Sequence, residues 1–364
     1  MSLIMKVALG NLGPITYALK ISLESLGVEV YQSLPNSESI HLLAQKYLPP
    51  ELCHPLKMLL GNYLYNIEHK PDAVIFFSGC DMCNMSPINY SYKEIFNDLG
   101  WYPEPYFCTI TSKKDFVLSY LNVLKKLSGK SWLEIAPSIY LGFKLFESFN
   151  FLDQVFYQLR PLFGDHLYVK NLYNDYFSRL ANAVSNKDIE KITGELNDFY
   201  IKNKVKINDS FLRVGLLGDV YTLAEPFLHQ NVDEQLGNMG IIVDRWSKHC
   251  LLSKKDLSIQ DKPSIKSEKI DNIFRNQYGV FTSLEILKLK RYVARGYDGI
   301  VFLSPLECNP NDALRNYLSI VQEQLEIPLM SLVFDEHSNK IAVTARLEAF
   351  VDLLHKRKRL LSLK

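Results

Sequence analysis

The side chains best suited to metal or redox chemistry in this sequence are cysteines. Cys80 and Cys83 have the Cys-x-x-Cys spacing, which can direct two thiolates at one metal ion or cluster, or form a redox dithiol. Cys53 stands where a loop is expected to become a helix, because Pro55 suits a first helical turn and amides at such an end can stabilise a thiolate. Cys308 follows a predicted strand far along the chain.

Several kinds of thiol site are compatible with one Cys-x-x-Cys pair. A thioredoxin-like site needs no remote cysteines, and tetrahedral zinc needs four ligands, often from two such pairs, of which this chain has one. An iron–sulfur cube takes thiolates from scattered loops, so three or four converging cysteines suit a cluster better than zinc. Cys108, within an apolar strand, and Cys250 are interpreted as buried thiols without a ligand role.

The elements that must position these thiols alternate between strand and helix at both ends of the chain. This alternation predicts an α/β fold with mostly parallel sheets, whose functional loops lie at the carboxyl ends of the strands. The predicted strands are 6–9, 28–31, 73–77, 106–110, 211–217, 241–243, 299–304 and 328–334, and the predicted helices are 14–26, 55–68, 92–99, one through 235 and 236, 282–294, 312–325 and 342–356.

Residues from about 113 to 204 lack strand patterns and repeat apolar side chains at helical spacing. We therefore predict a Rossmann-like lobe over residues 1–112, a helical segment over 113–208 and a second Rossmann-like lobe over 209–364. The polar stretch 253–269 is expected to be an exposed excursion.

A short internal repeat links the two predicted lobes. Residues 72–78 (DAVIFFS) resemble residues 298–304 (DGIVFLS), with Asp, apolar strand residues and Ser at matched offsets. Each segment ends close to cysteine, Cys80 and Cys83 in the first and Cys308 in the second. If the lobes face each other, loops at the carboxyl ends of both sheets meet in one cleft, which would bring these thiols together.

Two glycine-bearing turns, Gly10 with Gly13 and Gly215 with Gly218, each follow a predicted strand and open a helix. Their amides are candidates for holding a cofactor's phosphate or a cluster's sulfides, although these glycines can equally serve only to allow tight turns. The sequence has neither the three-glycine dinucleotide fingerprint nor a Gly-Lys-Ser/Thr phosphate loop, so ATP hydrolysis by this chain is not expected.

Acid–base candidates follow the strand that ends near residue 217. Tyr221 and Glu225, with Asp219, are placed to donate or accept protons in the predicted cleft. Glu225 precedes Pro226 and can equally cap the following helix. His54, beside Cys53, is expected to face solvent.

Several of these motifs together resemble a known family. They are ELCHPLKMLLGN at 51–62, GCDMC at 79–83, VGLLGDVY at 214–221, EPF at 225–227, the Cys308 loop and TARLEAF at 344–350. In this order, over nearly the whole chain, they resemble the 2-hydroxyacyl-CoA dehydratase superfamily, and more closely its activase-related branch, which is related to the double-cubane cluster proteins.

The resemblance implies two Rossmann-like lobes with an oxygen-sensitive 4Fe-4S cluster between them. Cys53, Cys83 and Cys308 are the implied ligands, with Cys80 as an additional one. A separate ATP-hydrolysing activator, itself an iron–sulfur protein, is the implied electron donor, and an acyl-CoA ester is the implied substrate. The reaction would be radical dehydration or reduction. The alternative cofactor is an 8Fe-9S double cubane, but Cys108 and Cys250 do not occupy matching loops.

The resemblance has departures, and other functions stay open. Residues 84–87 read Asn-Met-Ser-Pro where relatives commonly have an Arg-Phe-Gly-Tyr-like run, and residues 336–342 lack a glycine-bearing acidic stretch, so the substrate contacts are unassigned. A non-catalytic electron carrier or cluster-delivery partner is one alternative, and a double-cubane reductase of a small molecule is a second. A structural zinc or thiol protein is a third.

Composition limits the partners and the compartment. Lys and Arg total 41 against 40 Asp and Glu, so no broad field attracts nucleic acid or an anionic membrane. The chain shows no signal-peptide pattern and no apolar run long enough for a membrane span, and its six cysteines are interpreted as thiols of a reducing cytosol. We expect a cytoplasmic protein that binds neither nucleic acid nor membrane, with a homodimer and a heterodimer both open.

Overall fold

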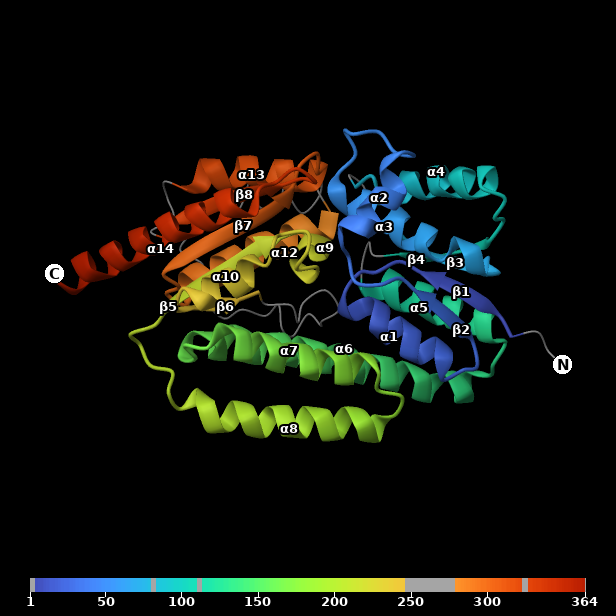
Figure 1. Ribbon diagram of the computed structural model, residues 1–364, viewed down its shortest axis with the longest axis horizontal. Coiled ribbons are helices and arrows are strands. Elements are labelled where there is room, and N and C mark those ends of the chain that lie inside the picture. The colour runs from blue at the N-terminus through green and yellow to red at the C-terminus, as the bar shows by residue number, and fades with distance from the viewer. Residues whose placement is uncertain (1–3, 80–82, 110–112, 246–278, 323–326, 364) are drawn as a thin grey trace.

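The computed structural model describes residues 4–79, 83–109, 113–245, 279–322 and 327–363. Over these residues the chain is an α/β protein built on two four-stranded parallel sheets, one in each of two lobes (Figure 1). The prediction of two Rossmann-like parallel-sheet lobes with a helical middle segment is therefore confirmed. Cys80, Cys250 and the predicted excursion at 253–269 lie outside the described residues.

The two sheets have the same topology. The strand order is β2-β1-β3-β4 in the first and β6-β5-β7-β8 in the second, so corresponding strands take corresponding places. β3 and β7 are inner strands made of continuous apolar runs, as burial on both faces requires. The strands are β1 (Lys6–Leu9), β2 (Glu29–Gln32), β3 (Ala73–Ser78), β4 (Glu104–Thr109), β5 (Leu212–Gly218), β6 (Ile241–Asp244), β7 (Gly299–Pro305) and β8 (Leu329–Phe334).

The aspartates of the repeated sequence make the same contact in both lobes. Asp72 Oδ2 accepts a hydrogen bond of 2.9 Å from the amide of Lys6 at the start of β1. Asp298 Oδ2 accepts one of 2.8 Å from the amide of Arg213, near the start of β5. Each aspartate therefore fastens the entry of its inner strand to the neighbouring strand, which gives the repeat a physical role in both lobes.

Helices of the first lobe pack closely on its sheet and on one another. α2 was not expected from the sequence, and it crosses α3 so closely that a Cβ on Gly61 would lie 2.1 Å from the Ile40 carbonyl oxygen. α4 begins at Met85 rather than at the predicted residue 92. The elements are α1 (Pro14–Glu24), α2 (Glu38–Gln45), α3 (His54–Tyr65), the 3-10 helix η1 (Ile67–His69) and α4 (Met85–Asp98).

The middle segment is helical, as predicted, and its longest helix joins the lobes. α6 begins at a capping box of Ser131 and Glu134 and has 28 residues, or about 42 Å at 1.5 Å per residue. Its contacts extend from α1 in the first lobe to β6 in the second (Figure 1). The elements are α5 (Lys113–Ser128), α6 (Trp132–Leu159), the 3-10 helix η2 (Arg160–Leu162), α7 (His166–Ala181) and α8 (Asn186–Lys204).

In the second lobe, the chain forms two helices where the sequence predicted a single one. α9 stops at Ala224 because the next residue, Glu225, has an extended backbone and precedes Pro226, which disfavours the helical conformation before it. The chain then turns and α10 begins at Val232. The elements are α9 (Val220–Ala224), α10 (Val232–Asn238), α12 (Gly279–Ala294), α13 (Asn309–Val321) and α14 (Lys340–Ser362).

The segment around α9 also joins the lobes. Tyr221 and Leu228 are buried within the hydrophobic core of the first lobe, although both come from the second part of the chain. This packing brings the carboxyl ends of β3 and β7 to a common region. Within the described residues, no helix combines the length and apolar character that crossing a membrane requires.

Candidate functional site

Three of the four proposed cysteine ligands line a single pocket between the lobes. Cys53 and Cys83 come from the first lobe and Cys308 from the second, while Cys80 lies outside the described residues. The pocket has a volume of about 100 Å³. Its lining residues are Leu12, Ile15, Cys53, Pro55, Leu56, Gly79, Cys83, Met85, Phe116, Gly218, Asp219, Val220, Tyr221, Thr282, Glu285, Pro305, Cys308, Pro310 and Asn311.

Each of these cysteines stands at or next to the start of a helix. Cys53 is the N-cap of α3 and Cys308 is the N-cap of α13, and each is followed two residues later by a proline, Pro55 and Pro310. Cys83 lies immediately before the N-cap of α4. Amides at helix starts carry partial positive charge, so the pocket is surrounded by groups that favour anionic sulfur. The Cys-x-Pro arrangement at Cys308 is the signal in the sequence for a helix that starts at this cysteine.

The buried thiols are protonated when no cation neutralises them. Burial raises the pKa of Cys53 to about 12, against a backbone hydrogen bond from Leu56 that acts in the opposite direction. Burial likewise raises the pKa of Cys308 far above its usual range, opposed by a backbone hydrogen bond from Asn311. The Met85 amide donates to Cys83 Sγ over 3.4 Å. A bound metal would reverse this protonation, because coordination deprotonates thiols outright.

The donor set suits an iron–sulfur cluster in its chemistry. Three thiols converge on one mainly apolar pocket, and backbone amides donate toward their sulfurs, which are the features that hold and tune such clusters. Among the residues that the structure describes, no group of three or more His, Cys, Asp or Glu side chains has the spacing of a metal-ion site.

Two carboxylates, the buried Glu285 and the half-buried Asp219, complete the second-lobe side of the pocket. Glu285 on α12 accepts from the Gly218 amide over 3.0 Å and from Lys288 Nζ over 2.6 Å, and burial raises its pKa. Asp219 caps α9 by accepting from the Tyr221 amide over 3.1 Å. Asn311 on α13 donates to the other Asp219 oxygen over 3.3 Å. Sequence reasoning missed Glu285; its i,i+3 spacing to Lys288 was the available signal.

Tyr221 and Glu225, the predicted acid–base pair, face different cavities. Tyr221 lines the cysteine pocket, whereas Glu225 lines a second, larger pocket. Asn36 of the first lobe bridges them, because its Nδ2 donates to the Tyr221 hydroxyl over 3.1 Å and to Glu225 Oε2 over 2.8 Å. Burial raises the pKa of Glu225 to about 8, despite the opposing hydrogen bond from Asn36. Glu225 is therefore mostly protonated at neutral pH.

The four candidate glycines divide into two kinds. Cβ atoms on Gly10 and Gly215 would lie 3.0 Å from the Tyr63 hydroxyl and 2.4 Å from the Tyr292 ring, so close packing accounts for both. Gly13 has a φ of 66° and lines the larger pocket, and Gly218 lines the cysteine pocket. The amides of both are already bonded within the protein, Gly13 to Asn11 Oδ1 over 3.1 Å and Gly218 to Glu285.

His54 does not face solvent, so that expectation was wrong. Its side chain is buried beside His41, with ring centroids 5.1 Å apart in an edge-to-face arrangement. Burial lowers the pKa of His54 to about 4, and the ring is neutral at neutral pH. The cause is the tight packing of α2 against α3, which the sequence pattern did not reveal.

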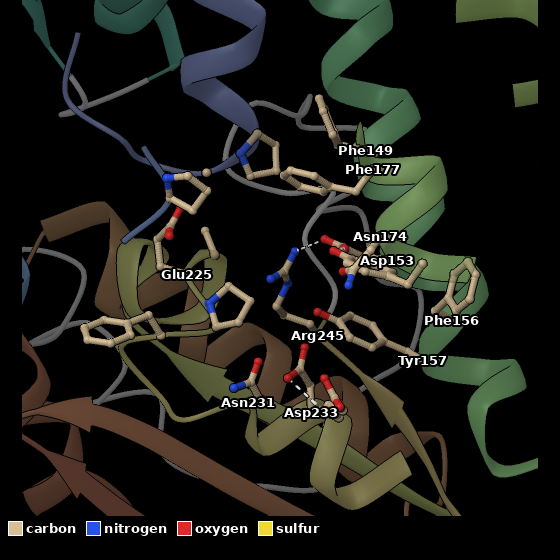
Figure 2. A pocket seen from close by; sticks show the side chains of 18 of the residues that line it. Phe149, Asp153, Phe156, Tyr157, Asn174, Phe177, Glu225, Asn231, Asp233 and Arg245 are labelled. Atoms are coloured by element: carbon tan, nitrogen blue, oxygen red, sulfur yellow. Dashed lines mark hydrogen bonds and ion pairs between the residues drawn. The ribbon is translucent and has the colours of Figure 1, made fainter. Parts of the chain in front are cut away.

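The larger pocket lies where both lobes meet the middle helices (Figure 2). It has a volume of about 440 Å³, within the range of small-molecule sites. At its centre Arg245 points toward Asp153 of α6, and Glu225 approaches from the second-lobe side.

No family model matches this chain, and comparison with curated proteins found no match.

Proposed function

We propose that this protein holds an iron–sulfur cluster between its lobes and works in low-potential electron transfer, as a component similar to the 2-hydroxyacyl-CoA dehydratases. The observation that carries the proposal is the meeting of Cys53, Cys83 and Cys308 in one pocket, although more than 200 residues separate the first two from the third. The cofactor would be a 4Fe-4S cluster, with Cys80 as an additional ligand. An 8Fe-9S double cubane is the alternative.

Bound in this pocket, such a cluster would supply one-electron chemistry at low potential. The chain's own residues would hold and shield it. Amides at the starts of α3, α4 and α13 would donate to the thiolates and stabilise negative charge. The apolar side chains of Leu12, Leu56 and Phe116 would exclude water. Glu285, held by the Gly218 amide and Lys288, is the buried carboxylate placed to keep or release a proton beside the thiols.

The electron source would be a separate ATP-hydrolysing activator, itself an iron–sulfur protein, because this chain has no phosphate-loop sequence. The acceptor would be an acyl-CoA ester undergoing radical dehydration or reduction. In a second candidate function, the protein passes its electron to another protein and has no substrate. The small volume of the cysteine pocket favours that second function, since small-molecule sites usually occupy about 300–1,000 Å³.

Anaerobic purification followed by iron, sulfide and zinc analysis tests the cluster. We expect iron and sulfide in equal amounts, a brown colour that air bleaches, and loss of both in Cys308→Ala. Cys108→Ala is the matched control, because Cys108 is buried in β4 and does not line the pocket. A full iron load in Cys308→Ala, or zinc in place of iron, would refute the proposal. A second experiment adds acyl-CoA esters to the reduced protein. Reoxidation with formation of product would support an enzyme, whereas electron loss only to another protein would support a carrier.

A further inference from the structure

The larger pocket has features of a ligand site that are independent of the cysteines. Its lining comes from both lobes and from α6 and α7, so it exists only in the assembled fold. Seven aromatic side chains and three prolines form much of its wall, and one of the seven is Phe227 of the second lobe. The others are Tyr17, Phe149, Phe156, Tyr157, Tyr173, Phe177, Pro14, Pro35 and Pro226.

The aromatic rings are held rigidly against one another. The Tyr17 and Phe149 centroids lie 5.1 Å apart, and those of Phe149 and Phe177 lie 5.0 Å apart. Phe156 packs edge-to-face on Tyr173 at 5.3 Å. Figure 2 shows Phe149 and Phe177 together at one side of the pocket and Tyr157 at another. Such preformed aromatic surfaces bind flat rings at little cost in side-chain entropy.

The charged groups of the pocket are already paired within the protein. Arg245 forms an ion pair with Asp153, and it lies 5.6 Å from the centre of the Tyr157 ring. The Tyr173 hydroxyl donates to the other Asp153 oxygen over 2.8 Å. A charged ligand would have to displace one member of this buried pair and leave the other uncompensated, which is unfavourable.

The remaining charges at the pocket also have partners. The exposed Lys170 Nζ lies 3.5 Å from Glu234, and the buried Arg160 lies 3.9 Å from the same carboxylate. Asp233 interacts with His229 and with the Tyr157 hydroxyl. Among the described residues of the lining, the three cations Arg160, Lys170 and Arg245 are matched in number by the three carboxylates Asp153, Asp233 and Glu234.

Neutral hydrogen-bonding groups remain for a ligand. Among the described residues, the side-chain amides of Asn174 and Asn231 make no hydrogen bond within the protein, and both line this pocket. Glu225 also lines the pocket; its Oε2 accepts from Asn36 over 2.8 Å, and burial raises its pKa to about 8, so its carboxyl group is mostly protonated at neutral pH. These groups can both donate and accept.

We propose that this pocket binds a small, uncharged, planar aromatic molecule that carries an amide or carbonyl group. The rings of α1, α6 and α7 would stack on its faces, and the neutral polar groups would bond its substituent. The inference does not depend on the cysteine pocket and applies whether or not a cluster is bound.

Ligand-observed NMR and calorimetry on the full chain at pH 7 test the proposal with four probes of similar size. Benzamide is neutral and aromatic, benzoate is anionic, benzylamine is cationic, and cyclohexanecarboxamide is neutral but not planar. We expect benzamide to bind most tightly of the four. Equal or tighter binding of either charged probe, or of the cyclohexane compound, would overturn the proposal, as would the absence of benzamide binding at millimolar concentration.

Two variants locate the binding. Asn174→Trp places a large side chain at the exposed edge of the pocket and should reduce benzamide binding at least tenfold. Asp175→Trp is the matched control, because this neighbouring exposed residue of α7 does not line the pocket, and binding should be unchanged. Phe177→Leu removes one ring while keeping an apolar side chain, and should weaken binding roughly two- to tenfold even if Asn174→Trp does not fold. Unchanged affinity in a folded Asn174→Trp protein, or in Phe177→Leu, would contradict the assignment.

Discussion

Lys57 and Glu336 form an ion pair across the two lobes, with Nζ and Oε1 2.7 Å apart and side chains 3% and 16% exposed. Lys57 lies on α3, one turn after Cys53, and Glu336 follows β8. Lys57 also donates to the Pro50 carbonyl oxygen over 2.7 Å. The pair therefore fastens the helix that begins at Cys53 to the lobe that supplies Cys308.

Replacement of Lys57 should loosen this junction. Lys57→Met leaves the Glu336 carboxylate without its partner, and we expect the free energy of unfolding to fall by about 2 kcal/mol, since Glu336 keeps some solvent contact. Urea denaturation measures the change. The double variant Lys57→Met/Glu336→Leu should recover part of the loss, because no charge is then left unpaired. A Lys57→Met protein as stable as the wild type would show that the pair contributes nothing.

Glu225 should make stability depend on pH. Its folded-state pKa of about 8 lies above the ordinary value of 4.5, so the folded protein retains a proton that the unfolded chain releases. Stability from this group is complete below about pH 4.5 and is lost as pH rises toward 8. Glu225→Gln is neutral throughout and can still accept from Asn36. The ratio of the unfolding equilibrium constant of Glu225→Gln to that of the wild type should therefore fall by about tenfold for each unit of increase in pH across that window. Parallel stability curves for the two proteins between pH 5 and 9 would contradict the raised pKa.

The crossing of α1 and α6 should not tolerate a side chain at Gly142. A Cβ there would lie 2.2 Å from Ser22 Oγ and 2.7 Å from the Ala18 carbonyl oxygen, so Gly142→Ala should destabilise the fold by about 2 kcal/mol. Gly194→Ala is the control, because Gly194 lies on α8 with open space around it and alanine favours helix by about 0.5–1 kcal/mol. Thermal melts of both variants should shift in opposite directions. A stabilised Gly142→Ala protein would mean that the two helices are farther apart than described.

The repeated aspartates should have similar energetic roles. Asp72→Ala and Asp298→Ala each remove one hydrogen bond to a backbone amide of the adjacent strand, and each should cost about 1 kcal/mol in chemical denaturation. Asp98→Ala, at an exposed position of the first lobe, should change stability by less than about 0.5 kcal/mol. A large difference between the two aspartate variants would argue against equivalent roles in the two lobes.

Local sequence patterns were sufficient to predict most of the strands and helices. Continuous apolar runs identified β3 and β7, and helical spacing identified the middle segment, because these signals depend only on neighbouring residues. Proline after Cys53 correctly placed the start of α3. The break between α9 and α10 was also readable from Pro226, but apolar spacing through residues 235 and 236 suggested one helix instead.

The tertiary structure alone decided which distant residues meet. Burial of Tyr221 and Leu228 in the core of the first lobe turns α9 toward α3, and this contact places Cys308 in the same pocket as Cys53 and Cys83. The larger pocket likewise depends on α6 contacting both lobes. The sequence by itself determined the elements and the kinds of side chain at their ends. Packing between lobes determined their convergence, because the free energy of that contact is shared among residues far apart in the chain and leaves no local pattern.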